Sequence, residues 1–161
     1  MRIAKNGWTA YALALAVIAL DQLSKYWILG VLRLPEQASH EILWPLQFTR
    51  IWNEGVSFGL FQAQHDVVRW GLVLFSLAVA ALLTGWARNQ PRLLPALGLG
   101  LVIGGAIGNA IDRARFGAVV DFIDVQRLGF FPWIFNVADS GITIGVILLL
   151  LDRLRPQRPA A

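Results

Sequence analysis

The stretch Leu93–Arg113, which reads LLPALGLGLVIGGAIGNAIDR, decides the fold class of this chain. It carries no charge before its last two residues, and about 20 mostly apolar residues are enough for a helix to cross a bilayer. Gly104 and Gly108 lie four positions apart, a small-xxx-small spacing that lets two helices approach closely. The stretch therefore predicts a membrane-spanning helix that packs tightly against a neighbour.

Three further segments have the same apolar character. The composition agrees, because 57% of the residues are hydrophobic and 15% are charged, against roughly 25% charged residues in soluble domains. The connection at Arg88–Arg92 is short enough only for a tight hairpin. We expect an all-α membrane protein that forms a single domain over residues 1–161, with four transmembrane helices at about residues 8–29, 68–87, 93–113 and 133–151.

The two longer connections, about residues 30–67 and 114–132, have room for folded structure. In the first, Leu46–Trp52 shows partial alternation of apolar and polar residues and is rich in aromatic and β-branched side chains. This pattern is typical of a short strand or hairpin. We therefore expect a small β-structured part on one side of the membrane.

The basic residues orient the helices, because cytoplasmic loops usually hold the excess of lysine and arginine. One side carries only one acidic residue, Asp152, against seven basic ones: Arg2, Lys5, Arg88, Arg92, Arg153, Arg155 and Arg158. We expect both termini on this side, in the cytoplasm. The first segment also resembles a cleavable signal peptide, but its apolar character continues to Leu29, so we expect it to span and stay.

Charge and cysteine content exclude other classes. A net charge of +4 and a pI near 10.3 would indicate a nucleic-acid partner in a soluble protein. Here the basic residues lie at the ends of apolar segments, so membrane topology explains them and no nucleic-acid partner is expected. The chain has no cysteine, which excludes disulfides and thiolate metal sites.

Ionisable residues inside membrane segments are candidates for a functional site. On the first segment Asp21, Ser24 and Lys25 share one helix face, and Asp21 can pair with Lys25. On the third, Asn109 and Arg113 are neighbours four positions apart. Asp112 needs another partner, since Arg113 directly follows it and points elsewhere. Structural bracing, substrate holding and catalysis all stay open for these residues.

The fourth segment carries Asn136, Asp139, Ser140 and Thr143 on one face. Asp139 has no basic residue within a helical turn, and as part of a helix it would lie about 9 Å below Trp133. Upstream, Asp121 lies in an apolar segment too short to span, which places it near the membrane surface. Asp121 and Asp139 thus both fall in the outer half of the molecule, where two carboxylates can meet.

Two carboxylates a few ångströms apart share a proton, so one acts as base and the other as acid. This pair suits peptide hydrolysis by an activated water and needs no metal or other cofactor. The chain lacks His-Glu-x-x-His and Gly-x-Ser-x-Gly. Ser24 and Lys25 are adjacent on a helix and point about 100° apart, so they cannot form a serine–lysine dyad with each other.

Several motifs closely resemble the lipoprotein signal peptidase (signal peptidase II) family: Asp21–Lys25, Asn53–Gly59, Gly104–Arg113, Val119–Ile123 and Phe135–Ser140. The resemblance covers nearly the whole chain. It implies an aspartic endopeptidase that cleaves diacylglyceryl-modified prolipoproteins just before the lipidated cysteine, with Asp121 and Asp139 as the catalytic pair. The residues expected to shape the site or hold substrate are Asp21, Lys25, Asn53, Gly108, Asn109, Asp112, Arg113, Asn136 and Ser140.

The resemblance also implies a location and partners. It predicts a bacterial inner membrane protein with its active site near the outer leaflet, in contact with membrane lipids and inhibited by cyclic-peptide antibiotics such as globomycin. A small extracytoplasmic β-rich cradle is expected in the first loop, with Phe58 and Phe61 helping to cover the substrate.

Two other functions compete with proteolysis. Buried aspartates with a lysine and an arginine also occur in transporters and proton relays, although here the charges gather on one side of the membrane. A non-catalytic scaffold whose ion pairs fix helix packing is the second alternative.

Overall fold

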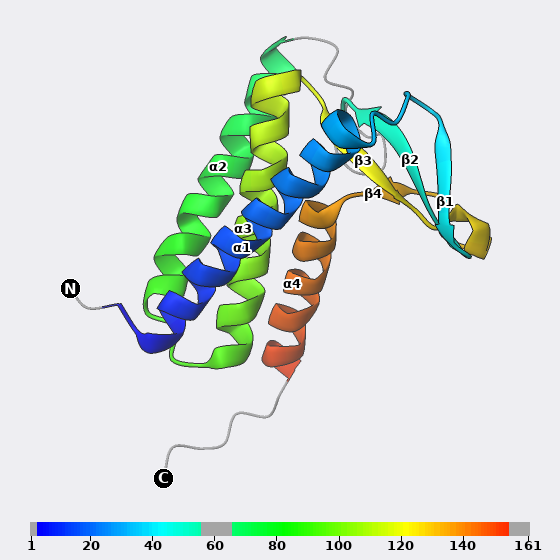
Figure 1. Cartoon of the computed structure of the whole chain (residues 1–161). Coiled ribbons are helices and arrows are strands. Elements are labelled where there is room, and N and C mark those ends of the chain that lie inside the picture. The colour runs from blue at the N-terminus through cyan, green and yellow to red at the C-terminus, as the bar shows by residue number, and fades with distance from the viewer. Residues whose placement is uncertain (1–2, 56–65, 155–161) are drawn as a thin grey trace.

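The computed structural model describes residues 3–55 and 66–154. Within these residues four long helices form a bundle and four short strands form a sheet beside one end of it (Figure 1). Phe58 and Phe61, the Val56–Gly59 part of one motif, and Arg2, Arg155 and Arg158 lie outside the described residues. The helices are α1 (Lys5–Tyr26), α2 (Asp66–Arg88), α3 (Leu93–Phe116) and α4 (Val137–Leu154).

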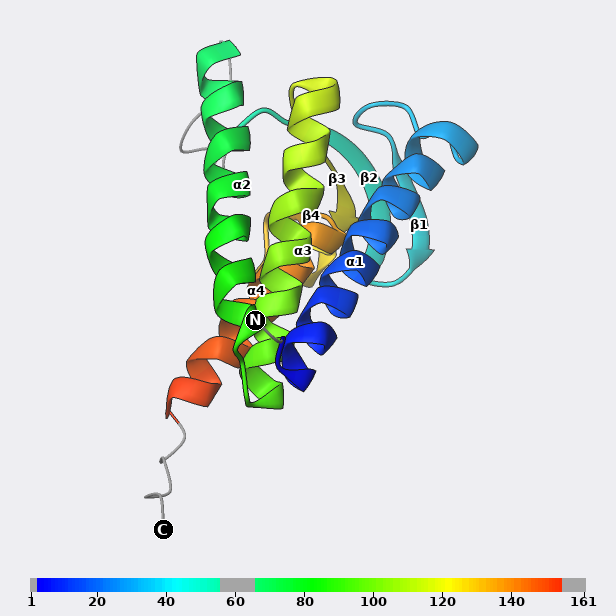
Figure 2. The same ribbon diagram turned by 90° about the vertical axis from the view of Figure 1, so that its left-hand side faces the viewer.

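Helix α3 is the centre of the bundle, between α2 and α1 and in contact with α4 (Figure 2). Its glycines permit this packing: a Cβ on Gly104 would lie 2.7 Å from the carbonyl oxygen of Ala14 on α1, and one on Gly98 would lie 2.8 Å from that of Gly145 on α4. The predicted small-xxx-small contact is therefore present, and α3 buries most of its surface against the other helices.

Among the residues that the structure describes, three helical stretches are long and apolar enough to cross a membrane: Lys5–Val31, Asp66–Arg88 and Leu93–Phe116. The first combines α1 with a π-helical continuation, η1 (Trp27–Val31). Large apolar side chains on α2, such as Leu74, Phe75 and Leu82, are exposed, as expected of a face that lies against lipid. The chain is therefore a multi-pass membrane protein with a small antiparallel sheet.

The start of the fourth helix differs from the expectation. Residues 133–136 are not helical: Ile134 and Phe135 form strand β4 (Ile134–Phe135), which pairs with β3 (Val119–Asp124). Helix α4 begins at Val137, so Asp139 lies in its first turn. The expectation that Asp139 lies below Trp133 on one continuous helix is therefore wrong.

The sheet is antiparallel in the order β1-β2-β3-β4. Strands β1 (Ser39–Leu43) and β2 (Leu46–Asn53) form a hairpin, which confirms the strand expected at Leu46–Trp52. Strand β3 pairs with β2, bringing Ile51 opposite Asp121. A small core of Ile28, Leu34 and Phe122 fastens the sheet to η1, so the sheet is anchored where the first helix ends.

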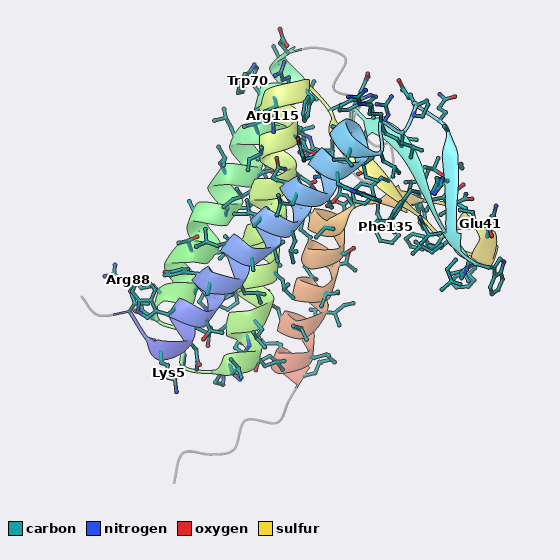
Figure 3. All side chains as sticks on the ribbon, in the orientation of Figure 1. Lys5, Glu41, Trp70, Arg88, Arg115 and Phe135 are labelled. Carbon is teal, nitrogen blue, oxygen red and sulfur yellow. The ribbon has the colours of Figure 1, made fainter. Side chains whose placement is uncertain are left out.

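The two ends of the bundle carry different connections. Lys5 and Arg88 lie at one end, and Trp70 and Arg115 lie at the other (Figure 3). At the first end, the carbonyl of Arg88 at the end of α2 accepts a hydrogen bond from the backbone N–H of Ala4 at 3.0 Å. Arg92 also pairs with Asp152 at 2.8 Å, which holds the start of α3 beside the end of α4. The sheet and the remaining buried charged residues lie toward the other end.

Candidate active site

Strand β3 presents two aspartates to opposite sides of the sheet. Asp121 and Asp124 are three positions apart, and side chains alternate along a strand. Asp124 accepts hydrogen bonds from Gln47 at 2.6 Å and from Thr49 at 2.7 Å on β2, and from the backbone N–H of Gln126 at 2.9 Å. Asp124 therefore ties the sheet together, which leaves Asp121 to face the helix bundle.

Asp139 belongs to the cap of α4. The side-chain oxygen of Asn136 accepts the backbone N–H of Asp139 at 2.9 Å, and the carboxylate of Asp139 accepts the backbone N–H of Asn136 at 3.3 Å. This reciprocal pattern is a capping box, with an asparagine and an aspartate in the two positions. It satisfies two backbone donors and fixes the Asp139 carboxylate at the positive end of the helix dipole.

Asn136 also joins the two aspartates. Its amide nitrogen donates to Oδ1 of Asp121 at 2.6 Å, while the same side chain caps the helix that carries Asp139. Asn53 on β2 donates to the other oxygen of Asp121 at 3.0 Å. Asn109 on α3 donates to Asp139 at 2.8 Å. Three asparagines from three different elements therefore hold the two carboxylates.

Both aspartates line one pocket of about 940 Å³ between the sheet and α4. The other wall residues are mostly apolar and aromatic. One of them, Phe135 on β4, lies near the start of α4 in Figure 3. The pocket thus combines two carboxylates with an apolar surface formed by Ile51, Trp52, Phe131, Trp133, Ile134, Phe135, Ile142 and Ile144.

The surroundings of Asp121 favour its protonated form. Burial and the neighbouring charge of Asp139 raise the pKa of Asp121 to about 7, although hydrogen bonds from Asn53 and Asn136 oppose the rise. Only 1% of Asp121 is exposed. A carboxyl group in this state can hold or release a proton near neutral pH, as acid–base catalysis requires.

Asp124 shows the opposite behaviour although it is equally buried. Burial by itself would raise the pKa of Asp124, but the hydrogen bonds from Gln126, Thr49 and Gln47, together with the charge of Arg127, bring that pKa below its usual value. Asp124 therefore stays ionised at neutral pH, which suits a structural carboxylate.

A second buried cluster lies next to the pocket. The Lys25 ammonium is 2.7 Å from the carboxylate of Asp21 and 2.8 Å from that of Asp112. The expected Asp21–Lys25 pair is present. Asp112, which needed a partner other than Arg113, pairs with Lys25. Gln22 donates to Asp112 at 2.9 Å and to Asp21 at 3.1 Å. Ser24 donates to the carbonyl of Asp21 within its own helix and stays outside this cluster.

Gly108 makes room for this cluster. A Cβ on Gly108 would lie 2.7 Å from Oδ2 of Asp21. Since a contact this close would displace the carboxylate, only glycine lets Asp21 pass between α3 and α4. Gly108 therefore shapes the site through the space that it leaves open.

Arg113 lies near the C-terminal end of α3. It donates to the carbonyl of Gly55 at 2.7 Å and fixes the end of the segment that carries Asn53. Its Nε has no hydrogen-bond partner among the described residues. Arg69 on α2 donates to the carbonyls of Arg113 and Ala114 at 2.8 and 2.7 Å, which closes the C-terminus of α3.

Most of the expected site residues lie in one region. Asp121 and Asp139 line the pocket together with Asn53 and Ser140, and Ser140 donates to the Asn136 carbonyl at 2.9 Å. Asn109 and Asn136 do not line the pocket but donate hydrogen bonds to Asp139 and Asp121. Asp21, Lys25, Asp112 and Gly108 form the adjoining cluster. Gln22 was not expected, although it stands inside the Asp21–Lys25 motif, because neighbouring positions on a helix point in different directions.

Within residues 3–55 and 66–154, no group of three or more His, Cys, Asp or Glu side chains is placed to hold a metal ion. The polar side chains that line the pocket include carboxylates, amides and the hydroxyls of Ser140 and Thr143.

Comparison with known proteins finds one family. Residues 13–155 match the family model for signal peptidase (SPase) II. The lipoprotein signal peptidase of Caulobacter vibrioides is 52% identical over 153 residues, which cover 94% of this chain and 90% of that protein. The lipoprotein signal peptidase of Methylorubrum extorquens is 45% identical over 142 residues, which cover 88% of this chain and 83% of that protein.

Two solved structures share the fold. A bacterial membrane enzyme determined by the in meso method at 2.3 Å resolution is 28% identical, with a TM-score of 0.85 over 100% of this chain and 99% of that one. Another, determined at 1.9 Å resolution, is 30% identical, with a TM-score of 0.81 over 97% and 98% of the two chains.

The fold and the pocket thus define a multi-pass membrane enzyme whose polar groups gather at one end of its helices. The matches to the family model and to relatives over most of the chain show which family of membrane enzymes this is. The chain belongs to the signal peptidase II family of proteases.

Proposed function

We propose that this protein removes signal peptides from prolipoproteins, with Asp121 and Asp139 as an aspartic dyad that cleaves just before the lipidated cysteine. The family supports the substrate class. The observation that carries the mechanism is the shared pocket: Asp121 and Asp139 both line it, and Asn136 holds them both. Two carboxylates in one pocket can supply both the base and the acid that hydrolysis by an activated water uses.

The reaction follows from the two protonation states. The ionised carboxylate takes a proton from a water molecule, whose oxygen attacks the scissile carbonyl carbon. The protonated carboxyl donates a hydrogen bond to the carbonyl oxygen, which carries the growing negative charge. When the tetrahedral intermediate collapses, the C–N bond breaks and a carboxyl group supplies a proton to the leaving amine. The raised pKa of Asp121 suits the protonated partner at the start.

The pocket wall supports a lipidated substrate. Its apolar side chains come from both the sheet and α4, and Ile142 and Ile144 extend the wall along α4. Apolar walls with a few convergent polar groups bind mostly apolar ligands and orient them through those polar groups. A diacylglyceryl chain beside a peptide bond matches this combination.

The distribution of charge favours a peptidase over a transport path. Among the described residues, the buried charged side chains lie near the outer end of the helices, apart from Asp152, which pairs with Arg92 at the other end. A path for ions needs polar stations through both halves of the membrane.

The proposal extends to topology and location. All four helices cross a bacterial inner membrane as one domain, both termini are cytoplasmic, and the sheet forms an extracytoplasmic cradle at the outer leaflet. Of the site-shaping residues, Asn53 and Ser140 act at the pocket wall, whereas Asn109 and Asn136 orient the two carboxylates. Membrane lipids surround the helices, and cyclic-peptide antibiotics such as globomycin inhibit the enzyme by occupying the dyad.

The test uses purified protein in detergent with a diacylglyceryl-modified prolipoprotein and its unlipidated form. Signal-peptide release is followed for the wild type, Asp121→Asn and Asp139→Asn. Asp66→Asn is the matched control, because the Asp66 carboxylate is 86% exposed at the start of α2. Only the lipidated substrate should be cut, and each folded dyad variant should be inactive while the control is not. Near-normal activity of either dyad variant would refute the mechanism.

A further inference from the structure

Lys25, Asp21 and Asp112 form a buried ionic cluster that does not line the pocket. Both ion pairs are short, 2.7 and 2.8 Å, and all three residues are at most 2% exposed. An ionic cluster in such a place needs every charge to be satisfied, since an unpaired buried charge is strongly unfavourable. The other hydrogen bonds that Asp21 and Asp112 accept therefore indicate which parts of the backbone the cluster holds in place.

Each of these aspartates accepts a backbone N–H next to a member of the dyad. Asp21 accepts the N–H of Ala138 at 3.0 Å, and Ala138 directly precedes Asp139. Asp112 accepts the N–H of Val120 at 3.1 Å, and Val120 directly precedes Asp121. Lys25 lies between the two carboxylates. A single chain of charge-assisted contacts therefore runs from the backbone of β3 to the backbone of α4.

We propose that Asp21, Lys25 and Asp112 act as a spacer that sets the distance between the backbones carrying Asp121 and Asp139. The three are positioning residues, and the inference rests on the proposed function of the dyad. The contacts are directional and charge-assisted, which makes them about twice as strong as neutral hydrogen bonds. They hold two points of the backbone, whereas the asparagines of the pocket hold the side chains.

A spacer is needed because Asp121 and Asp139 lie on two elements that are packed against different parts of the protein. Asp121 belongs to a sheet beside the bundle, and Asp139 belongs to the first turn of a helix within it. Direct pairing between β3 and the segment before α4 is limited to Ile123–Phe135 and Asp124–Ile134. A displacement of about 1 Å in an active site can reduce the rate on the order of 100-fold, so the spacing needs a rigid connection.

A cluster that only braced the helices would not need these two N–H contacts. The Asp21–Lys25 and Lys25–Asp112 pairs already connect α1 with α3. The two N–H contacts also connect the cluster to β3 and to α4, at the residues next to Asp121 and Asp139. Gly108 fits the same role, because a Cβ there would strike the carboxylate of Asp21 at 2.7 Å.

The first experiment compares two replacements at each aspartate in the full-length protein. Asparagine keeps an oxygen that can accept the backbone N–H, whereas leucine has a similar size and no acceptor. We expect kcat to fall on the order of 100-fold for Asp21→Leu and Asp112→Leu, with KM within about threefold. Asp21→Asn and Asp112→Asn should keep activity within about tenfold of the wild type.

The second experiment uses Gly108→Ala, the mildest way to displace Asp21. Its matched control is Gly98→Ala, which introduces a contact of 2.8 Å between α3 and α4 at the Gly145 carbonyl, away from the cluster. Both substitutions should lower the thermal midpoint. Only Gly108→Ala should lower kcat of the folded protein.

The outcomes separate the spacer from the dyad. If the leucine and asparagine variants lose the same activity, if only KM changes, or if Gly108→Ala behaves like Gly98→Ala, the spacer is refuted while the dyad stands. If Asp121→Asn or Asp139→Asn stays active, the proposed function itself fails. Should a leucine variant not fold, the asparagine and Gly108→Ala variants still decide the question.

The free end of the sheet carries a separate feature, a group of exposed apolar side chains. Ile42, Leu43 and Trp44 lie at the β1–β2 turn, and Leu128 and Phe130 lie in the connection between β3 and β4. We call these five residues the tip surface. Trp44 is 67% and Phe130 is 77% exposed. Arg127 pairs with Glu41 at 2.8 Å, which ties the two turns into one surface.

The position of the tip surface indicates its partner. In Figure 1 the free end of the sheet lies beside the first turns of α4 and not beyond the end of the bundle. Figure 3 shows Glu41 at this free end. The neighbouring face of α4 is itself apolar and exposed at Ile144 and Ile147. The tip surface therefore continues, at the same level, the apolar surface that the helices present to lipid.

We infer that the tip surface inserts into the outer leaflet at the boundary between headgroups and acyl chains. Tryptophan is enriched at this boundary, and the Glu41–Arg127 pair lies where it can stay among the headgroups. The sheet is then held at two places, by η1 at the bundle and by lipid at its free end.

The chain has no cysteine, so single cysteines can be labelled without a background. Trp44→Cys and Phe130→Cys, each carrying a fluorophore, are reconstituted into vesicles whose lipids are brominated near the top of the acyl chain. Glu36→Cys, at an exposed position before β1, is the control. Quenching by the brominated lipid at positions 44 and 130, and only weakly at 36, is expected. Quenching by aqueous iodide at all three positions, without quenching by lipid, would show that the tip surface faces water or protein.

Discussion

The amide nitrogen of Asn136 lies 2.6 Å from the carboxylate of Asp121, and no other side-chain hydrogen bond to that carboxylate is shorter among the described residues. The same side chain caps α4 through its oxygen. Asn136→Ser keeps a capping oxygen but cannot reach Asp121, whereas Asn136→Ala loses both contacts. We expect both variants to lose most of their activity. The alanine variant should also lose about 1 kcal/mol of stability.

Thermal unfolding in detergent and initial cleavage rates separate these two effects. Equal thermal midpoints for the two variants would show that the cap does not depend on the Asn136 oxygen. Full activity of Asn136→Ser would show that the bond to Asp121 is not needed.

The raised pKa of Asp121 predicts a pH-dependent stability. An unfolded aspartate ionises near 3.8, whereas folded Asp121 holds its proton to about pH 7. Between these values the unfolded state releases a proton that the folded state keeps, so ionisation increasingly favours unfolding as the pH rises. Asp121→Asn lacks this titration. Its thermal midpoint relative to wild type should therefore increase from pH 4 to pH 7 and level off above.

Midpoints are measured for both proteins in the same buffers and detergent. Asparagine also changes the hydrogen bonds from Asn53 and Asn136, but that effect is constant with pH. A difference between the two proteins that does not vary over this pH range would contradict the raised pKa.

Asp124 should behave differently from Asp121 on the same strand. Asp124→Ala leaves the polar groups of Gln47, Thr49 and Gln126 without their buried acceptor, which should lower stability on the order of 2–4 kcal/mol. Cleavage by the folded variant should remain measurable, unlike that of Asp121→Asn. Because the pKa of Asp124 is lowered, its contribution to stability is present at neutral pH and is lost as the pH falls below its ordinary value of 3.8.

The comparison needs unfolding curves at pH 7 and at acidic pH. A stability loss at pH 7 that persists unchanged at the lowest accessible pH would contradict the assignment of an ionised Asp124. A complete loss of activity in a well-folded variant would place Asp124 in the reaction itself.

Metal chelators should leave the activity unchanged, because the proposed chemistry uses carboxylates alone. Cleavage of the lipidated substrate is measured before and after incubation with EDTA and with 1,10-phenanthroline, followed by dialysis. A loss of activity that added zinc or another divalent ion restores would refute the aspartic mechanism. Globomycin, by contrast, should inhibit in competition with the substrate.

The proposed orientation can be tested in intact cells. Single cysteines at Arg115 and Glu41 should react with a membrane-impermeant maleimide from outside. Cysteines at Lys5 and Asn89, which lie toward the other end of the helices and are exposed, should react only after the membrane is opened. The reverse pattern would invert the topology, and labelling of both sets from outside would contradict the crossings proposed for α1, α2 and α3.

Much of the site could be predicted from sequence because the functional residues stand in short motifs within apolar segments. Helical spacing correctly paired Asp21 with Lys25 and showed that Asp112 needed a distant partner. It could not identify that partner, since contacts between helices depend on packing that no local pattern encodes. Gly108 was expected as a site-shaping residue, but the carboxylate that requires its missing side chain appears only in the folded protein.

Strand structure explains the remaining misses. The apolar residues 133–136 read as the start of a helix, although Ile134 and Phe135 pair with β3. A two-residue strand depends wholly on its partner, so no periodicity reveals it. The different roles of Asp121 and Asp124 have the same origin. Once the segment is known to be a strand, their odd spacing places them on opposite faces.

The Arg92–Asp152 pair gives a common reference for the lengths of α3 and α4. From this pair α3 continues 24 residues to Phe116, whereas α4 extends only 15 residues to Val137. At about 1.5 Å per residue, α4 ends about 14 Å short of its neighbour. The sheet and the pocket that holds Asp121 and Asp139 lie beside this shorter end. With the proposed topology, we expect a local hydrophobic mismatch there, which thins the hydrocarbon layer. The proposed hydrolysis would thereby gain a route for the water that it consumes.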